Sequence, residues 1–594
     1  MKIDIIDGFE KSLLYKLKLY RRLFDRMHCV NSKMEKYKNE VIFIIGGIAI
    51  LMFSLWKSQY GLGGDDEAFY LTIPYRMCQG DKLLLDEWHV SQFSAFLLYP
   101  FMKAYLWVKS GNTEGIILSF RHIYICVNML VSCVLYWKLR KFEEKAYLVI
   151  WIYMLFTPYN IMALSYNTMG MMCNVLCVVF LVTANNKKSN YLISGIFFAG
   201  MVLCQPILII VFSIVYIGVI VWCVIKKRRK IIEFALSFLF GCIILAIPII
   251  IYILLNIKIG DLGLLIGEVL NDPEHKGVKS FGELIYKACI LYFPSVNINC
   301  KFFLLNTRVV LKCLYCVWLA LWIVIVMDKS RNNKRNIYLS VSGLLCVITS
   351  AVYLFNLQNS YINFLLFPWT LCGINIILLT DKREEKKKLI IVYIVAGMHV
   401  LSFLGSNQYG YVFNIALMSV CIIAMIIYLN ESRKRGKIVA AICSSIMICF
   451  VLYARGTHAF WETSLTALNE KCSIGPGKGI YTTEKRKDEL EELAKEALEM
   501  RVQKSDNVLL LTGKTVLYLS MDAPLAQYSA WLSGVSDLTF SRLHKYYEIN
   551  SNKVPNIIYI EAQYIDEEYH LEEWCKKNDF SFVSKESGVW LKAN

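Results

Sequence analysis

Three consecutive carboxylates, Asp65, Asp66 and Glu67, follow the first long apolar run of the chain, within GLGGDDEAFYLTIPYRM at residues 61–77. In water the repulsion between such neighbours is screened. In a partly desolvated cleft at a membrane face it would raise one pKa or recruit a cation, and either effect suits a general base or a ligand of Mg²⁺ or Mn²⁺. Asp65 and Glu67 are the candidate metal ligands. The plainer alternative is that the acids only cap the short helix that AFYLTIPYRM predicts.

Other polar residues of the outer loops are candidates for binding substrate. One group follows in the same loop and offers a polar corner with an aromatic face: Asp86, Glu87, Trp88 and His89. Cations on outer loops or at interfacial depth are candidates for contact with a phosphate: Arg76, Lys103, His275 and Lys276. For each cation alone, snorkelling or plain solvation is the simpler interpretation, and a structural loop role is equally open for His89.

The composition indicates a polytopic membrane protein, because 56% of the 594 residues are hydrophobic. The formal charge of +17 falls in short bursts between apolar runs rather than on one folded face, which excludes a nucleic-acid partner. Most of the 20 cysteines lie inside apolar runs and are predicted to be packing residues. Cys472 and Cys575 lie in the C-terminal segment and are candidates for a disulfide, provided that this segment is exported.

Apolar runs of roughly 17 to 25 residues, together with a shorter run at 190–203, predict about thirteen transmembrane helices. Lys and Arg gather on every second connection, which predicts a cytoplasmic N-terminus and an exported C-terminus at the plasma membrane. The first run, without a cleavage site after it, predicts a retained signal anchor. The segment 89–108 predicts an amphipathic helix at the interface; a fourteenth span there would reverse every later loop.

The chain is thereby divided into three parts. Residues 1–40 are a basic cytoplasmic segment, residues 41–454 an all-α transmembrane domain with external loops 58–114 and 257–301, and residues 455–594 a small extracytoplasmic α/β domain. Within the last part the patterns predict two helices and two buried strands: helices at 483–502 and 565–577, and strands at 506–513 and 555–562. GPGKG at 475–479 and TGKT at 512–515 lack phosphate-loop spacing or context and predict turns.

The order of an apolar first span, a short polar stretch and an acidic pair on an external loop with interfacial helices resembles the GT-C membrane glycosyltransferases. The protein O-mannosyltransferase and aminoarabinose-transferase type is the most similar, also in span count, orientation and exported C-terminal domain. The resemblance covers the membrane part in organisation, but in motif only DDEAFYLTIPYRM. It implies a GT-C-like fold of about thirteen transmembrane helices.

The resemblance also implies roles for individual residues. The aspartate of the acidic pair serves as catalytic base in that family, and it maps onto Asp66, followed by Glu67 and Tyr70. Asp65 is an extra acid that leaves the register open by one. Relatives carry an Arg-Tyr pair near two prolines; NSYINFLLFPW at 359–369 keeps Tyr361 and Pro368 but has Ser360 in place of the arginine.

The implied reaction is transfer of a sugar from a polyprenyl phosphate to an envelope glycan, lipid or protein at the outer face of the bilayer. An inverting transfer needs a base for the acceptor hydroxyl and cations for the departing phosphate, but no strong acid. Two other functions stay open. A transporter or flippase of a lipid-linked saccharide shares the spans, although the scarcity of carboxylates within the apolar runs counts against it. The other open function is that of a non-catalytic scaffold or sensor that displays the α/β domain.

Overall fold

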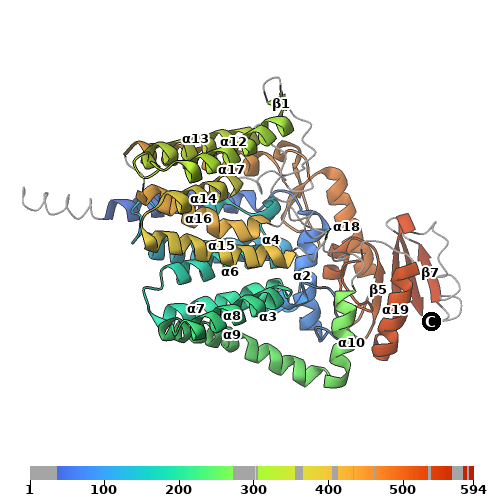
Figure 1. Ribbon diagram of the computed structural model, residues 1–594. Helices are drawn as coiled ribbons and strands as arrows, with labels where there is room; N and C mark the ends of the chain where they lie inside the picture. Colours follow the sequence, from blue (N-terminus) through green and yellow to red (C-terminus); the bar gives the residue numbers. More distant parts are fainter. Residues whose placement is uncertain are drawn as a thin grey trace, which may run out of the picture.

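The computed structural model describes residues 37–271, 282, 301–302, 305–354, 366–403, 413–431, 434–459, 462–532, 537–564, 580–584 and 588–593. A bundle of helices makes up most of it, and a small sheet region near the C-terminus lies against one end of the bundle (Figure 1). His275, Lys276, Tyr361, Cys575 and the helix predicted at 565–577 lie outside the described residues.

Seven helices in the described part of the chain are long and apolar enough to cross a membrane. They are Tyr37–Lys57, α4 (Ile116–Leu139), α8 (Leu208–Ile225), α9 (Arg229–Asn256), Val309–Met327 within α12 (Thr307–Met327), Arg335–Val352 within α13 (Arg335–Leu354), and Lys437–Thr457 within α17 (Lys434–Thr457). They support a polytopic helical protein.

The other predicted spans correspond to helices that are shorter or more polar. These are α5 (Tyr147–Leu155), α6 (Tyr166–Val182), α7 (Lys188–Cys204), α14 (Phe367–Leu379), α15 (Arg383–Phe403) and α16 (Phe413–Glu431). The run at 146–164 illustrates the reason: α5 ends at Leu155, and the residues before Pro158 are extended, because proline disfavours helix in the residue that precedes it. The total of thirteen therefore stays a prediction.

The short helix α7 is nevertheless tightly packed in the bundle. Gly195 of α7 faces Gly241 of α9, and a methyl group on Gly195 would lie 1.9 Å from the carbonyl oxygen of Phe238. Two backbones in such close contact are typical of small residues at the interface of membrane helices.

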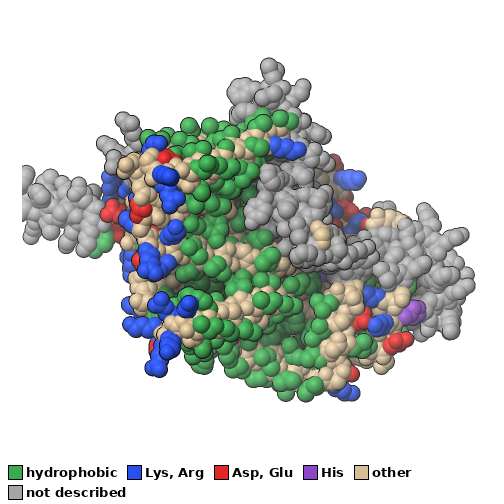
Figure 2. All heavy atoms as spheres, in the orientation of Figure 1, with side chains coloured by type: hydrophobic (Ala, Val, Ile, Leu, Met, Phe, Trp, Pro, Cys, Tyr) green, Lys and Arg blue, Asp and Glu red, His purple; other side chains and the backbone are tan. Residues whose placement is uncertain are grey.

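Lys and Arg side chains gather at the end of the bundle that lies away from the sheet region, beyond a broad hydrophobic surface (Figure 2). Two helices of the first loop lie at the opposite end, beside the sheet region (Figure 1): α2 (Gly64–Gln79) and α3 (Ala95–Val108). The helix predicted at 89–108 corresponds to η1 (Gln92–Ser94) and α3. In the last turn of α3, the Trp107 side chain is 83% exposed. Most of α2 is buried.

The sheet region contains both predicted strands and the first predicted helix. They are β5 (Val508–Leu511), β6 (Ile557–Glu561) and α18 (Glu484–Glu499). The sheet has the order β5-β6-β8-β7, with β5 parallel to β6 and the other pairs antiparallel; β7 is Phe580–Ser584 and β8 is Gly588–Ala593. The helix α19 (Asp537–Ile549) was not predicted.

Contacts between the first loop and the sheet region explain the burial of α2. The Tyr75 hydroxyl donates to the Met521 carbonyl at 2.7 Å, and the Trp88 amide donates to the Tyr528 carbonyl at 2.6 Å. The Gly61 amide donates to the backbone carbonyl of Tyr481 at 2.8 Å. Gly61 has φ +75°, and a Cβ there would lie 2.3 Å from the Ala459 Cβ, so only glycine fits. The start of α2 is thus held between bundle and sheet region.

Candidate functional site

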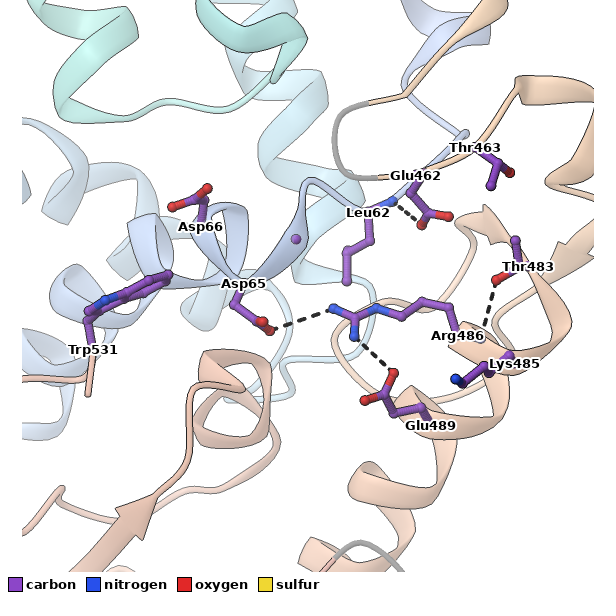
Figure 3. A pocket seen from close by; sticks show the side chains of 11 residues that line it. Leu62, Asp65, Asp66, Glu462, Thr463, Thr483, Lys485, Arg486, Glu489 and Trp531 are labelled. Carbon is purple, nitrogen blue, oxygen red and sulfur yellow. Dashed lines mark hydrogen bonds and ion pairs between the residues drawn. The ribbon is translucent and has the colours of Figure 1, made fainter. Parts of the chain in front are cut away.

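A pocket of about 670 Å³ opens where the N-terminus of α2 meets the N-terminus of α18 (Figure 3). Its lining combines acids, cations and one tryptophan from four separate parts of the chain. The lining residues are Leu62, Gly64, Asp65, Asp66, Glu462, Thr463, Thr483, Lys485, Arg486, Glu489 and Trp531. The volume is in the range of small-molecule sites.

Glu67 fixes the beginning of α2 and does not line this pocket. Its side chain folds back, so that Oε2 accepts from the Gly63 amide at 2.9 Å. Arg121 of α4 donates from Nε to Oε1 and from Nη2 to Oε2, both at 2.6 Å. Glu67 is 1% exposed. This bidentate pair corrects the prediction that Glu67 acts beside the base or holds a metal, because its oxygens are already engaged.

Asp65 faces the cationic side of the pocket. Its Oδ1 lies 3.6 Å from Nη2 of Arg486, and the Thr515 hydroxyl donates to its backbone carbonyl at 2.6 Å. Burial raises the pKa of the Asp65 carboxyl above its usual value, and the charge of Arg486 opposes that rise. In Figure 3, Asp65 lies between Trp531 and the Arg486 guanidinium.

Asp66 also lines the pocket, but its side chain points to the other side of α2 from Arg486 (Figure 3). Its charge acts on Tyr166 at the start of α6. The Tyr166 ring meets the Tyr70 ring edge to face, with 5.7 Å between centroids. The structure therefore brings Asp66 and Tyr70, which the resemblance had paired, to one aromatic corner beside the pocket.

The cations of the pocket belong to the first turn of α18. The Thr483 hydroxyl caps this helix by accepting from the Arg486 amide at 3.4 Å, and the Arg486 guanidinium reaches Glu489 at 2.9 Å. Lys485 is exposed and has no ion pair with any described residue. A helix N-terminus with free amide groups and two cations favours bound anions.

Sequence reasoning missed this half of the site. Lys485, Arg486 and Trp531 belong to the predicted extracytoplasmic domain at 455–594, far in sequence from the three acids. The only signal was a threonine followed by a run of basic residues at the start of a strongly helical segment, which predicts a capped N-terminus but not what that N-terminus faces. Lys514 of the TGKT turn pairs with Glu489 at 2.6 Å and with Glu561 at 3.3 Å, as an ordinary structural lysine.

Arg76 occupies a separate buried cluster. Its Nε donates to Asp81 at 2.6 Å and Nη1 to Glu87 at 2.7 Å, while Nη2 donates to the carbonyls of Asp86 at 2.5 Å and Gln527 at 3.0 Å. Arg76 and Glu87 are each 1% exposed. This network corrects the predicted substrate contacts of Arg76, Asp86 and Glu87, because it joins the first loop to the sheet region inside the protein.

The remaining predicted residues also lie away from the pocket lining. Trp88 is fully buried and stacks on Tyr528, with 5.9 Å between centroids. His89 is 4% exposed, and its Nδ1 lies 2.7 Å from the Ser91 hydroxyl. Both are therefore packing residues, not a sugar-stacking corner. Lys103 lies on α3 over the Tyr99 ring, 5.6 Å from its centroid.

The predicted metal ligands do not form one site. Asp65 faces Arg486, whereas Glu67 is engaged by Arg121. Among the described residues, no group of three or more His, Cys, Asp or Glu side chains is placed to hold a metal ion. The residues present thus do not fit Mg²⁺ or Mn²⁺ at Asp65 and Glu67.

The pocket can bind an anionic group beside α18 and a hydroxyl group beside Asp66, with Trp531 available to cover a sugar face. Neither the comparison with protein-family models nor the comparison with curated proteins finds a match to this chain.

Proposed function

We propose that this protein is a polytopic membrane glycosyltransferase that moves a sugar from a polyprenyl phosphate to a hydroxyl group of an envelope glycan, lipid or protein. The observation that carries the proposal is the pocket that Asp65 and Asp66 line together with the cationic N-terminus of α18. A transfer from a sugar phosphate needs this combination: a carboxylate for the proton and positive charge for the leaving group.

In the proposed reaction the acceptor oxygen attacks C1 of the sugar, and Asp66 takes the hydroxyl proton as the new C–O bond forms. The bond between C1 and the phosphate oxygen breaks, and its electron pair leaves with the polyprenyl phosphate. The anomeric configuration is inverted. Arg486 and Lys485 neutralise the phosphate, and the pairing of Arg486 with Asp65 orients the guanidinium.

The placement of this pocket supports reaction at a membrane face. It lies at the end of the bundle beside the sheet region, whereas Lys and Arg gather at the other end (Figure 2). By the positive-inside rule we expect the basic end to be cytoplasmic and the pocket to lie at the outer face of the plasma membrane. The proposal includes the GT-C-like arrangement of about thirteen spans and an exported C-terminal region.

The second candidate function is a flippase of the same lipid-linked saccharide, favoured by the seven helices that are long and apolar enough to cross a membrane in the described part of the chain. It moves its substrate intact and breaks no glycosidic bond. The two functions therefore differ in whether the free polyprenyl phosphate appears.

Mass spectrometry of lipid-linked sugars and envelope polymers, from cells with and without the protein, tests the proposal. Loss of the protein should cause one sugar phospholipid to accumulate and one polymer to lack that sugar. Expression of the Asp66→Asn variant should leave this defect in place. Asp488→Asn, an exposed acid of α18 that does not line the pocket, should restore the wild-type pattern.

Full restoration by Asp66→Asn would remove the assigned base. Movement of intact lipid-linked sugar into vesicles that contain the purified protein, without release of polyprenyl phosphate, would favour the flippase instead.

A further inference from the structure

A second polar cluster lies inside the helical bundle, and no part of it belongs to the pocket lining. Lys57 ends the first apolar helix and is 2% exposed; Arg455, in the last turn of α17, is 1% exposed. The Arg455 guanidinium lies 5.7 Å from the centroid of the Phe53 ring. Phe53 and Lys57 are four residues apart on one helix and therefore share a face. The two cations thus approach each other at the ends of two spans.

Neither cation has a carboxylate partner among the described residues. Arg455 donates from Nη1 to the Leu155 carbonyl at 2.7 Å and from Nη2 to the sulfur of Met162, and its Nε has no hydrogen-bond partner. The Lys57 ammonium has no hydrogen bond or ion pair with any described residue, although the charges of Arg121 and Arg455 both act on it.

The nearest acids are engaged elsewhere. Glu67 is bound by Arg121 through both oxygens. Glu462, whose charge also acts on Lys57, accepts from the Leu62 amide at 2.9 Å and from the Thr482 hydroxyl at 2.7 Å. An unpaired charge inside a protein is strongly unfavourable, so two of them side by side call for a counter-charge.

Hydroxyl donors complete the cluster. The Tyr124 and Tyr153 hydroxyls are buried without a hydrogen-bond partner. The charge of Arg455 acts on Tyr124, and Tyr124 in turn acts on Tyr153. Tyr153 is also two residues before Leu155, to which Arg455 is bonded. Buried polar groups are nearly always satisfied, so an unused guanidinium N–H, an ammonium and two hydroxyls mark a binding site for an acceptor.

We propose that Lys57, Arg455, Tyr124 and Tyr153 form a buried binding site for a phosphate group. Guanidinium and ammonium together match an oxyanion in charge, and the guanidinium fork favours oxygen acceptors of this geometry. The ends of the membrane helices lie at headgroup depth, where lipid phosphates are found. The bound phosphate group belongs either to inorganic phosphate or to a lipid. This site does not depend on the proposed glycosyl transfer.

The test uses the full chain, freed of lipid in a detergent without phosphate. Its melting temperature is followed against inorganic phosphate, with chloride at matched ionic strength as reference, and in a second arm against phosphatidylglycerol in mixed micelles. We expect the melting temperature to rise with phosphate but not with chloride. A response to inorganic phosphate identifies the free ion as a ligand, and a response to the lipid alone identifies a headgroup.

Single substitutions of the cations give the site-specific readout. Lys57→Met and Arg455→Met should weaken the apparent affinity about tenfold to a hundredfold, because each removes a charged hydrogen-bond donor. Lys226→Met and Arg331→Met, exposed cations outside the cluster, should keep the wild-type response.

Two results would overturn the proposal. The first is a wild-type protein whose melting temperature responds to neither source of phosphate. The second is a variant, Lys57→Met or Arg455→Met, that melts at a higher temperature than the wild type in every buffer. That gain in stability would mean that the cations are simply unpaired, since removal of an uncompensated buried charge stabilises a protein. If one variant does not fold, the other variant and the titration of the wild-type protein still show whether the cluster binds phosphate.

Discussion

The Asp65 carboxylate lies 3.6 Å from the Arg486 guanidinium, so the N-termini of α2 and α18 face each other with opposite charges. The two side chains are 28% and 24% exposed, which leaves both reachable from the pocket. An acid of the first loop and a cation of the sheet region therefore share a binding surface.

The first prediction concerns Arg486. In an assay with a polyprenyl-phosphate sugar, Arg486→Gln should lower turnover about 10²-fold, because one preorganised donor to the leaving phosphate is lost. Arg486→Lys should keep part of the activity. The neighbouring Lys487 pairs with Glu470 instead, at 3.1 Å, so Lys487→Gln is the matched control and should behave like the wild type. Equal activity of Arg486→Gln and wild type would remove Arg486 from the site.

The second prediction is a pH dependence of stability at Asp65. Burial raises the pKa of this carboxyl in the folded protein, so the fold disfavours its ionised form. Asp65→Asn should therefore raise the melting temperature at pH 7. The gain should shrink as the pH falls through the raised pKa and vanish below the usual aspartate pKa of about 3.9, where the carboxyl is protonated in both states.

Melting curves of both proteins from pH 3 to pH 8 check this. The opposite sign, a loss of stability at pH 7 that disappears in acid, would mean that attraction to Arg486 outweighs burial. Arg486 itself keeps a partner in Glu489 in the variant, so the comparison isolates Asp65.

The third prediction concerns the pair of Glu67 and Arg121. Glu67→Gln or Arg121→Met should each lower the free energy of unfolding by about 3 to 5 kcal/mol, because the partner is left as an uncompensated buried charge. The double variant Glu67→Met/Arg121→Met should recover much of that loss. Chemical denaturation in detergent measures the free energy of unfolding of the wild type and of each variant.

An exposed pair provides the control for that experiment. Lys478 and Glu114 lie 2.9 Å apart with side chains 49% and 40% exposed, and Lys478→Met should cost at most about 1 kcal/mol. Equal costs for the buried and the exposed pair would contradict the burial that the structure assigns to Glu67.

The fourth prediction tests the packing of α7. Gly195→Ala should destabilise the protein by about 1 to 3 kcal/mol, because the new methyl would overlap the Phe238 carbonyl and force α7 from α9. Gly218 in α8 has open space around the same position, so Gly218→Ala should be neutral or stabilising by about 0.5 to 1 kcal/mol. Thermal unfolding of the two variants measures the difference, and equal effects would argue against direct contact of α7 with α9.

The sequence alone determined those features that depend on local pattern. Apolar runs predicted a polytopic helical protein, and helical and strand periodicity predicted α18, β5 and β6 at nearly their observed positions. Hydrophobic patterns are set by which face of an element avoids water, and each element carries this information in its own residues. The predicted total of about thirteen spans is not confirmed, because short helices such as α5 and α7 differ too little in length from buried helices that do not span a membrane.

Only the tertiary structure decided the roles of the individual acids and cations. Asp65, Asp66 and Glu67 are adjacent acids in the sequence. Successive helical residues point in directions about 100° apart, so that the first meets Arg486, the second approaches Tyr166 and the third meets Arg121. The same holds for Arg76, an apparent surface cation that is buried among Asp81 and Glu87. Partners contributed by distant segments decide whether a charge is structural or available for chemistry, and a linear pattern does not contain their positions.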